Sequence, residues 1–129
     1  MSSAEQRLGA DAFLAAARDS VVLDVRSPSE FEKGHVPGAQ SLPLFTDDER
    51  AVVGTTYKQV GKSEAIDEGL KFVGPKLQSL AARARELFES QRSPKPLLVY
   101  CWRGGMRSGS VGWLLRTAQI PTAICEGGY

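Results

Sequence analysis

The sequence predicts an α/β fold with a mostly parallel central sheet flanked by helices on both faces. Short runs of aliphatic and β-branched residues at 21–25, 97–100 and 121–125 are typical of strands buried on both faces. Segments with helical apolar spacing separate these runs, and strands that alternate with helices form parallel sheets. Ligand sites in such folds lie at the carboxyl ends of the strands.

The first of these strands lies between two short predicted helices. Asp11 is a suitable N-cap for the first helix, which we expect to end near residues 19–20. In the second helix, Ser27 is a favourable cap, Pro28 suits the first turn and Gly34 ends the helix.

The next part of the chain carries weaker signals. A brief strand is predicted at 40–43, where a proline ends it. Residues 45–63 are polar and weakly periodic, which indicates a long connection with one short helix around 47–52.

The second half is more regular. A helix is predicted from Ser63 to a break at 74–75, and helical spacing resumes over 77–88 in the longest predicted helix. The next strand carries Cys101 at its carboxyl end, and a helix at 108–118 leads to the last strand.

Composition limits the classes of protein that the chain can belong to. Its 129 residues, 42% of them hydrophobic, fit one globular domain, which we assign to residues 1–129. The sequence has no signal-peptide core and no apolar run near the ~18 residues of a membrane span, so we expect a cytoplasmic protein. Two cysteines and one histidine give neither a disulfide framework nor a zinc site. We therefore expect thiol chemistry, with no metal and no bound cofactor.

Cys101 leaves a buried strand and is followed by a glycine-bearing loop and a helix. Backbone N–H groups and the positive end of the helix dipole favour the thiolate there, and the thiolate is the nucleophile. Arg103 and Arg107 add positive charge, while Gly104 and Gly105 let the backbone turn tightly around a bound anion. The predicted anion-binding loop consists of Trp102, Arg103, Gly104, Gly105, Met106, Arg107 and Ser108.

The alternative for Cys101 is a small side chain packed in the core, which is the commoner role of a lone cysteine. A packed core seldom needs a cysteine followed by arginines and glycines, so we favour the reactive thiol.

Charge is distributed unevenly along the chain. Residues 71–129 carry 9 basic against 3 acidic side chains, whereas residues 1–70 carry 7 against 12. The basic half could attract an anion, from a small oxyanion to a nucleic acid backbone. For Arg83, Arg85 and Arg92 we favour ordinary solvated helix faces.

Five motifs in the first half resemble the N-terminal signature of the rhodanese superfamily. They are Asp24-Val25-Arg26, Glu30-Phe31, Gly34-His35-Val36, Pro37-Gly38-Ala39 and Ser41-Leu42-Pro43. This resemblance implies a rhodanese-like fold in which Cys101 occupies the position of the essential cysteine.

The second half resembles more narrowly the rhodanese domain of bacterial tRNA 2-selenouridine synthases. The matching segments are 56–61, 100–110 and 126–129. The resemblance implies that selenium from selenophosphate replaces the sulfur of wobble 2-thiouridine in tRNA, with an S-geranylated intermediate available from geranyl diphosphate. Cys101 would take up selenium or receive the displaced group. The implied partners are tRNA and selenophosphate or its donor.

In that family, a domain with a phosphate-binding Gly-rich loop follows the rhodanese part. No G-x-x-x-x-G-K-[ST] motif occurs in this sequence, and the short helix that the family has after Gly127-Gly128 would lie beyond Tyr129. We therefore expect a fragment or excised domain that needs the missing C-terminal P-loop domain for full activity.

Five residues separate Cys101 from Arg107, one more than in ordinary sulfurtransferase rhodaneses. Cysteine phosphatases share this spacing because a longer loop surrounds a tetrahedral phosphate, and selenophosphate is also tetrahedral. Tyr100 stands where the rhodanese-fold phosphatases usually have histidine. The alternatives are a stand-alone sulfurtransferase, a phosphatase or arsenate-reductase-like enzyme, and a non-catalytic module that docks tRNA or a partner domain.

Other polar residues are assigned supporting roles. We expect Asp24 and Arg26 to stabilise the sheet end through an ion pair or backbone hydrogen bonds. For His35 we favour a hydrogen bond that holds its turn over a role beside the cysteine. Cys125 could be a resolving thiol, although core packing is favoured. Trp102 could stack on a base or a prenyl chain, or cover the core.

Overall fold

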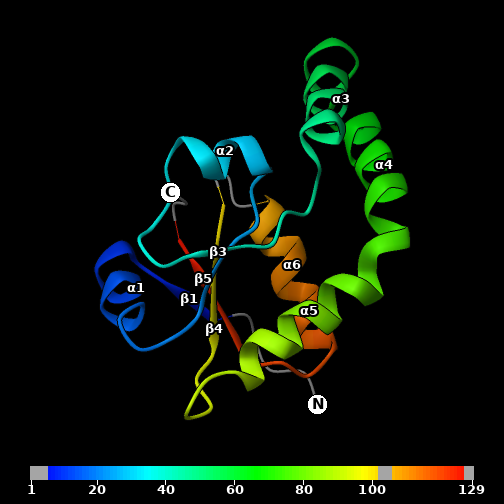
Figure 1. The fold of residues 1–129 in the computed structure, drawn as a ribbon. Helices are drawn as coiled ribbons and strands as arrows, with labels where there is room; N and C mark the ends of the chain where they lie inside the picture. The colour runs from blue at the N-terminus through cyan, green and yellow to red at the C-terminus, as the bar shows by residue number, and fades with distance from the viewer. Residues whose placement is uncertain (1–5, 102–105, 127–129) are drawn as a thin grey trace.

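A five-stranded parallel sheet forms the centre of the computed structural model, which describes residues 6–101 and 106–126 (Figure 1). Its strand order is β1-β5-β4-β2-β3, and each pair of neighbours runs parallel. The predicted α/β class is therefore confirmed. The strands are β1 (Gln6–Leu8), β2 (Val22–Asp24), β3 (Gln40–Ser41), β4 (Leu97–Tyr100) and β5 (Thr122–Cys125).

Helices lie on both faces of the sheet, as predicted. In Figure 1, α1 lies on one side of the strands, and α5 and α6 lie on the other. The pair formed by α3 and α4 projects away from the sheet beside α6. The helices are α1 (Ala10–Ala16), α2 (Pro28–Lys33), α3 (Asp47–Gln59), α4 (Lys62–Val73), the 3₁₀ turn η1 (Gly74–Lys76), α5 (Leu77–Glu89) and α6 (Met106–Thr117). None of the helices in the described ranges has the length and apolar character needed to cross a membrane.

The two faces of the sheet carry separate apolar clusters. Successive side chains of a strand point to opposite faces. In β4, Leu97 and Val99 therefore pack with α5 and α6, while Leu98 and Tyr100 pack with Phe13 of α1. All four β4 residues are buried. This alternation places Cys101, the next residue, on the α6 side of the sheet.

Several predicted boundaries were wrong. Gly9 is the N-cap of α1, and Asp11 lies in the first turn, where its charge suits the helix dipole. The last helix begins at Met106 rather than Ser108. The break at 74–75 is a 3₁₀ turn within a continuous helical segment.

The largest error concerns residues 45–63, which contain the whole 13-residue helix α3 and the start of α4 instead of a long loop. A capping box between Thr46 and Glu49 begins this helix. No residue of α3 is buried, so the apolar periodicity that identifies a helix in a sequence is weak there. Helices α3 and α5 both have 13 residues, so α5, which was predicted to be the longest helix, is no longer than α3.

Candidate active site

Cys101 follows the carboxyl end of β4 and is 2% exposed. Its Sγ atom lies 3.3 Å from the backbone nitrogen of Ser108, which donates to it, and 3.3 Å from the Ser108 hydroxyl. Ser108 lies in the first turn of α6 and is itself buried. The sulfur therefore sits at the amino end of a 12-residue helix, where the helix dipole favours a negative charge. This geometry suits a thiolate nucleophile.

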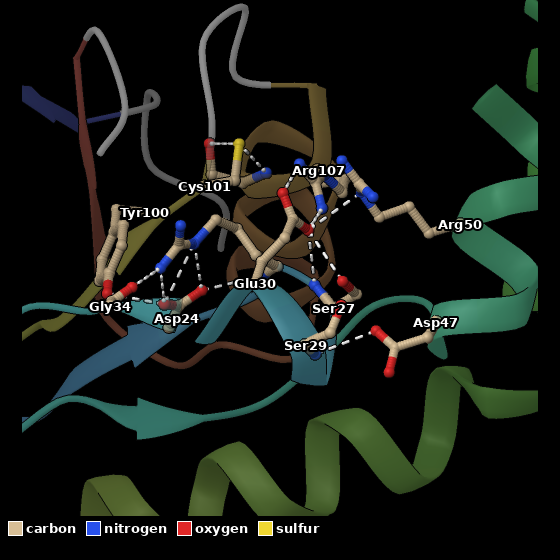
Figure 2. Close-up of polar contacts among 12 residues, drawn as sticks. Asp24, Ser27, Ser29, Glu30, Gly34, Asp47, Arg50, Tyr100, Cys101 and Arg107 are labelled. Carbon is tan, nitrogen blue, oxygen red and sulfur yellow. Dashed lines mark hydrogen bonds and ion pairs between the residues drawn. The ribbon is translucent and has the colours of Figure 1, made fainter. Parts of the chain in front are cut away.

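Arg107, one residue before Ser108, forms a two-pronged contact with Glu30 of α2 (Figure 2). Arg107 Nη1 donates to Glu30 Oε1 at 2.6 Å, and Nη2 donates to Oε2 at 3.3 Å. The two side chains are 17% and 13% exposed. Arg107 was predicted to bind an anion, and in the structure the end of its guanidinium group is held by an internal carboxylate.

Glu30 joins three helices. Its Oε1 atom accepts hydrogen bonds from the backbone nitrogen and the hydroxyl of Ser27, each at 3.0 Å. The same oxygen lies 3.1 Å from Arg50 Nε of α3. Burial opposes ionisation of Glu30, but the hydrogen bonds from Arg107 and Ser27 outweigh it and lower the pKa to about 2.

This lowered pKa makes folding stability depend on pH. Because the folded pKa lies below the ordinary value of 4.5, ionised Glu30 contributes its full stabilisation above pH 4.5. The contribution is lost as the pH falls toward about 2, and its size is up to about 3 kcal/mol. We expect Glu30→Gln to destabilise the protein at pH 7 and much less near pH 3, measured by urea unfolding at both pH values. An equal difference at both would contradict this prediction.

Asp24 and Arg26 form a buried ion pair at the end of β2, as expected for residues that support the sheet. Arg26 Nη2 lies 2.7 Å from Asp24 Oδ2, and the side chains are 3% and 0% exposed. Arg26 also donates to the carbonyl of Gly34 at 2.7 Å. The Tyr100 hydroxyl donates to Asp24 Oδ2 at 2.7 Å and accepts from the backbone nitrogen of Val36 at 3.0 Å. Burial and the nearby Asp24 raise the pKa of Tyr100, so its hydroxyl remains a donor.

His35 holds its turn, as favoured from the sequence. Its Nδ1 atom lies 2.7 Å from the carbonyl oxygen of Phe31, and the two rings stack with centroids 3.7 Å apart. These contacts explain the position of the ring without any chemical role.

A large apolar cavity lies beside the cysteine region, between α3, α4 and α6. Its volume is about 790 Å³, within the ordinary range for small-molecule sites. Arg50 and Arg107 line it together with apolar side chains from all three helices. The apolar lining includes Phe45, Val53, Ile66, Leu70, Met106 and Trp113.

Part of the predicted loop can be compared with the structure. Met106, Arg107 and Ser108 form the first turn of α6, where Met106 is exposed and lines the cavity. Trp102, Arg103, Gly104 and Gly105 lie outside the described residues. Cys125 packs in the apolar cluster on the α1 side of the sheet, and Cys101 packs on the α6 side. The two thiols therefore face opposite sides, which favours the packing role for Cys125.

Glu30, Arg50 and Tyr100 were not predicted as site residues. Glu30 was interpreted only as part of a helix start and of a family motif. Its partner Arg107 lies 77 residues away, and no local pattern reports such a contact. Tyr100 was noted only for its place before Cys101, although a tyrosine at the end of a buried strand needs a hydroxyl partner.

Together the fold and the site define a class: parallel α/β domains that present a buried cysteine between a central strand and a helix. The chain belongs to the rhodanese-like domain family, whose model matches residues 7–129.

Curated relatives show which proteins that contain such a domain the chain is similar to. The chain is 39% identical over 111 residues to a tRNA 2-selenouridine synthase from Nitrosomonas europaea, a match that covers 86% of this chain and 28% of the relative. It is 42% identical over 119 residues to the enzyme of the same name from Cronobacter sakazakii, covering 92% of this chain and 31% of the relative. The chain thus spans less than a third of these relatives.

Solved structures agree with the fold. The N-terminal domain of a Clostridium difficile 630 protein, provisionally named an ATP/GTP binding protein, superposes with a TM-score of 0.85 at 36% identity. The match covers 96% of this chain and 93% of that domain. A human single-domain sulfurtransferase superposes with a TM-score of 0.51 at 18% identity, covering 98% and 91% of the two chains, and shows the shared fold alone.

Proposed function

We propose that this chain is the rhodanese domain of a tRNA 2-selenouridine synthase, which replaces the sulfur of wobble 2-thiouridine in tRNA with selenium. The observation that carries the proposal is the position of Cys101 Sγ against Ser108 at the start of α6. It occurs in a chain about 40% identical to enzymes of that name.

In this proposal the Cys101 thiolate is the nucleophile. It attacks the selenium atom of selenophosphate, so that an S–Se bond forms as the P–Se bond breaks and the phosphorus group leaves with that electron pair as phosphite. The Ser108 amide and the dipole of α6 stabilise negative charge on the sulfur or on an atom bound to it. Arg107 supplies positive charge for the tetrahedral phosphorus group of the donor. No resident cofactor is needed for these roles.

The remaining partners follow from the relatives. Their greater length supports the presence of a further domain in such enzymes, and we propose that it is a C-terminal P-loop domain that acts as the partner of this one. The name of the Clostridium difficile protein is in keeping with such a domain. We place the substrate tRNA across both parts, in the cytoplasm.

The proposal is tested with a hybrid synthase, in which this chain replaces the part of the Nitrosomonas europaea enzyme that matches it. The hybrid is expressed in a bacterium that lacks its own synthase and is supplied with selenium. We expect 2-selenouridine among its tRNA nucleosides by mass spectrometry. If a hybrid that folds and binds tRNA yields only 2-thiouridine, the proposed function is wrong.

We propose that the apolar cavity binds the geranyl chain of geranyl diphosphate, with the diphosphate near Arg50 and Arg107. The apolar lining of the cavity and these two cations support this placement. Gly54 of α3 lines this cavity, and a Cβ built there meets nothing within 4 Å. A larger side chain at Gly54 would therefore enter the cavity without a backbone clash.

We expect Gly54→Leu to lower the affinity for geranyl diphosphate at least about tenfold, because the leucine occupies volume that the chain needs. The helix should not be destabilised, since leucine favours a helix by roughly 0.5–1 kcal/mol over glycine. Isothermal titration of the hybrid synthase measures the affinity, with Gly54→Ala as the matched control that leaves the cavity open. Equal affinity of both variants for geranyl diphosphate would show that the geranyl chain does not bind in this cavity.

A further inference from the structure

We propose that Glu30 is a positioning residue that fixes the direction of the Arg107 guanidinium group toward an oxyanion that binds beside the Cys101 thiol. The inference rests on the proposed anion-binding role of Arg107 and deepens it, since it names the group that keeps Arg107 in place.

The first support is the geometry of the contact. Glu30 engages the end of the guanidinium group, one carboxylate oxygen to each terminal nitrogen. Arginine has five N–H donors in a rigid plane, so a partner at this end fixes the direction of the other edge. Within residues 6–101 and 106–126, the Arg107 hydrogen bonds use only Nη1 and Nη2, so the edge that carries Nε can meet an anion.

The second support is that Glu30 is itself immobilised. Ser27 holds Glu30 Oε1 through both its backbone nitrogen and its hydroxyl, and Ser27 is fully buried. Ser27 follows Arg26, whose side chain is locked in the buried pair with Asp24. Glu30 is thus fastened to the end of the sheet, and a side chain held by it shares that rigidity.

The third support is the link to the thiol. Arg107 precedes Ser108, whose amide and hydroxyl contact Cys101 Sγ. Arg107 is therefore the charged residue nearest in sequence to Ser108, which contacts the sulfur. A shift of the Arg107 side chain changes where its positive charge lies relative to that contact. Arg50 adds a second cation on Glu30, so the three side chains keep a formal charge of +1 while remaining paired.

A purely structural role is the competing explanation, in which Glu30 only ties α2 to α3 and α6. A second competing explanation is that Glu30→Gln only removes a negative charge near the site. That explanation predicts a faster reaction of Cys101 with anions, whereas loss of positioning predicts a slower one. Asp47 provides a matched control for charge. Its carboxylate accepts from the nearby Ser29 amide, and its interactions in the described part of the chain are with Ser29, Ser27 and Arg50 rather than Arg107.

The test compares two reagents of nearly equal size, the anion iodoacetate and neutral iodoacetamide. The ratio of their rate constants at Cys101, followed by peptide mass spectrometry on the folded chain, cancels differences in access to the thiol. Circular dichroism at the assay temperature selects variants that are folded. The variants are Glu30→Gln, Asp47→Asn and Arg107→Met.

We expect Glu30→Gln to lower the iodoacetate to iodoacetamide ratio about tenfold, which is the scale of a charge-assisted hydrogen bond. Asp47→Asn should leave the ratio unchanged or raise it slightly. An unchanged or increased ratio in folded Glu30→Gln protein would overturn the positioning role. Arg107→Met separates the anion-binding role of Arg107 from the positioning role of Glu30. If Arg107→Met leaves the ratio unchanged, the anion-binding role of Arg107 is wrong. If it lowers the ratio and Glu30→Gln does not, only the inference about Glu30 fails.

Discussion

In the hybrid synthase, Cys101→Ser is expected to lower selenium incorporation into tRNA by roughly four orders of magnitude or more. The serine hydroxyl fits the space beside Ser108, but it does not ionise near neutral pH and is a far weaker nucleophile than a thiolate. The Ser108 amide that donates to the Cys101 sulfur would face an uncharged hydroxyl in the variant. The measurement is the ratio of 2-selenouridine to 2-thiouridine in tRNA by mass spectrometry.

Cys125→Ser is the matched control for this experiment. Cys125 is buried at the end of β5, the strand next to β4, but it packs on the opposite face of the sheet. We expect it to retain most of the activity, with only a moderate loss of stability. Comparable incorporation by the two variants would show that Cys101 is not the nucleophile.

The second large effect concerns stability. Asp24→Ala is expected to lower the free energy of unfolding by about 3–5 kcal/mol, because it leaves the charge of Arg26 buried without its carboxylate. The hydroxyl of Tyr100 loses an acceptor as well. For a domain whose free energy of unfolding is only a few kcal/mol, this loss leaves a substantial unfolded fraction. Urea unfolding at pH 7 measures the change.

Two controls identify the cause of this loss. Lys71→Ala removes an exposed pair with Asp67, and we expect a change within about 0.5 kcal/mol. The double variant Asp24→Leu with Arg26→Met replaces the pair by apolar side chains and should regain much of the stability. If the double variant is no more stable than Asp24→Ala, the buried charge is not the source of the effect.

The strands that hold the cysteine could be predicted because their signal is local. Residues 97–100 are apolar in an unbroken run, since β4 is covered on both faces, and the loop motif after it is recognisable by composition. The start of α2 was also readable, because Ser27 and Pro28 are strong local signals and Glu30 completes a capping box.

Other parts could not be predicted because they depend on distant partners. Residues 6–8 form a strand by pairing with β5, although Gln6 and Arg7 give no strand pattern. The site is similar: Glu30 and Arg107 belong to different elements, and only the folded sheet brings α2 and α6 together. The sequence pattern made the thiol a candidate, but nothing in it pointed to the Glu30 carboxylate that contacts Arg107.

The absence of buried residues in α3 has a consequence for the cavity that it borders. Little apolar area would be exposed if this helix frayed, so its local opening free energy should lie well below that of the sheet. The cavity can then change volume by fluctuations of α3 while β4 and the start of α6 stay fixed. The domain would then combine a helix that can move beside the cavity with a fixed position for the Cys101 sulfur.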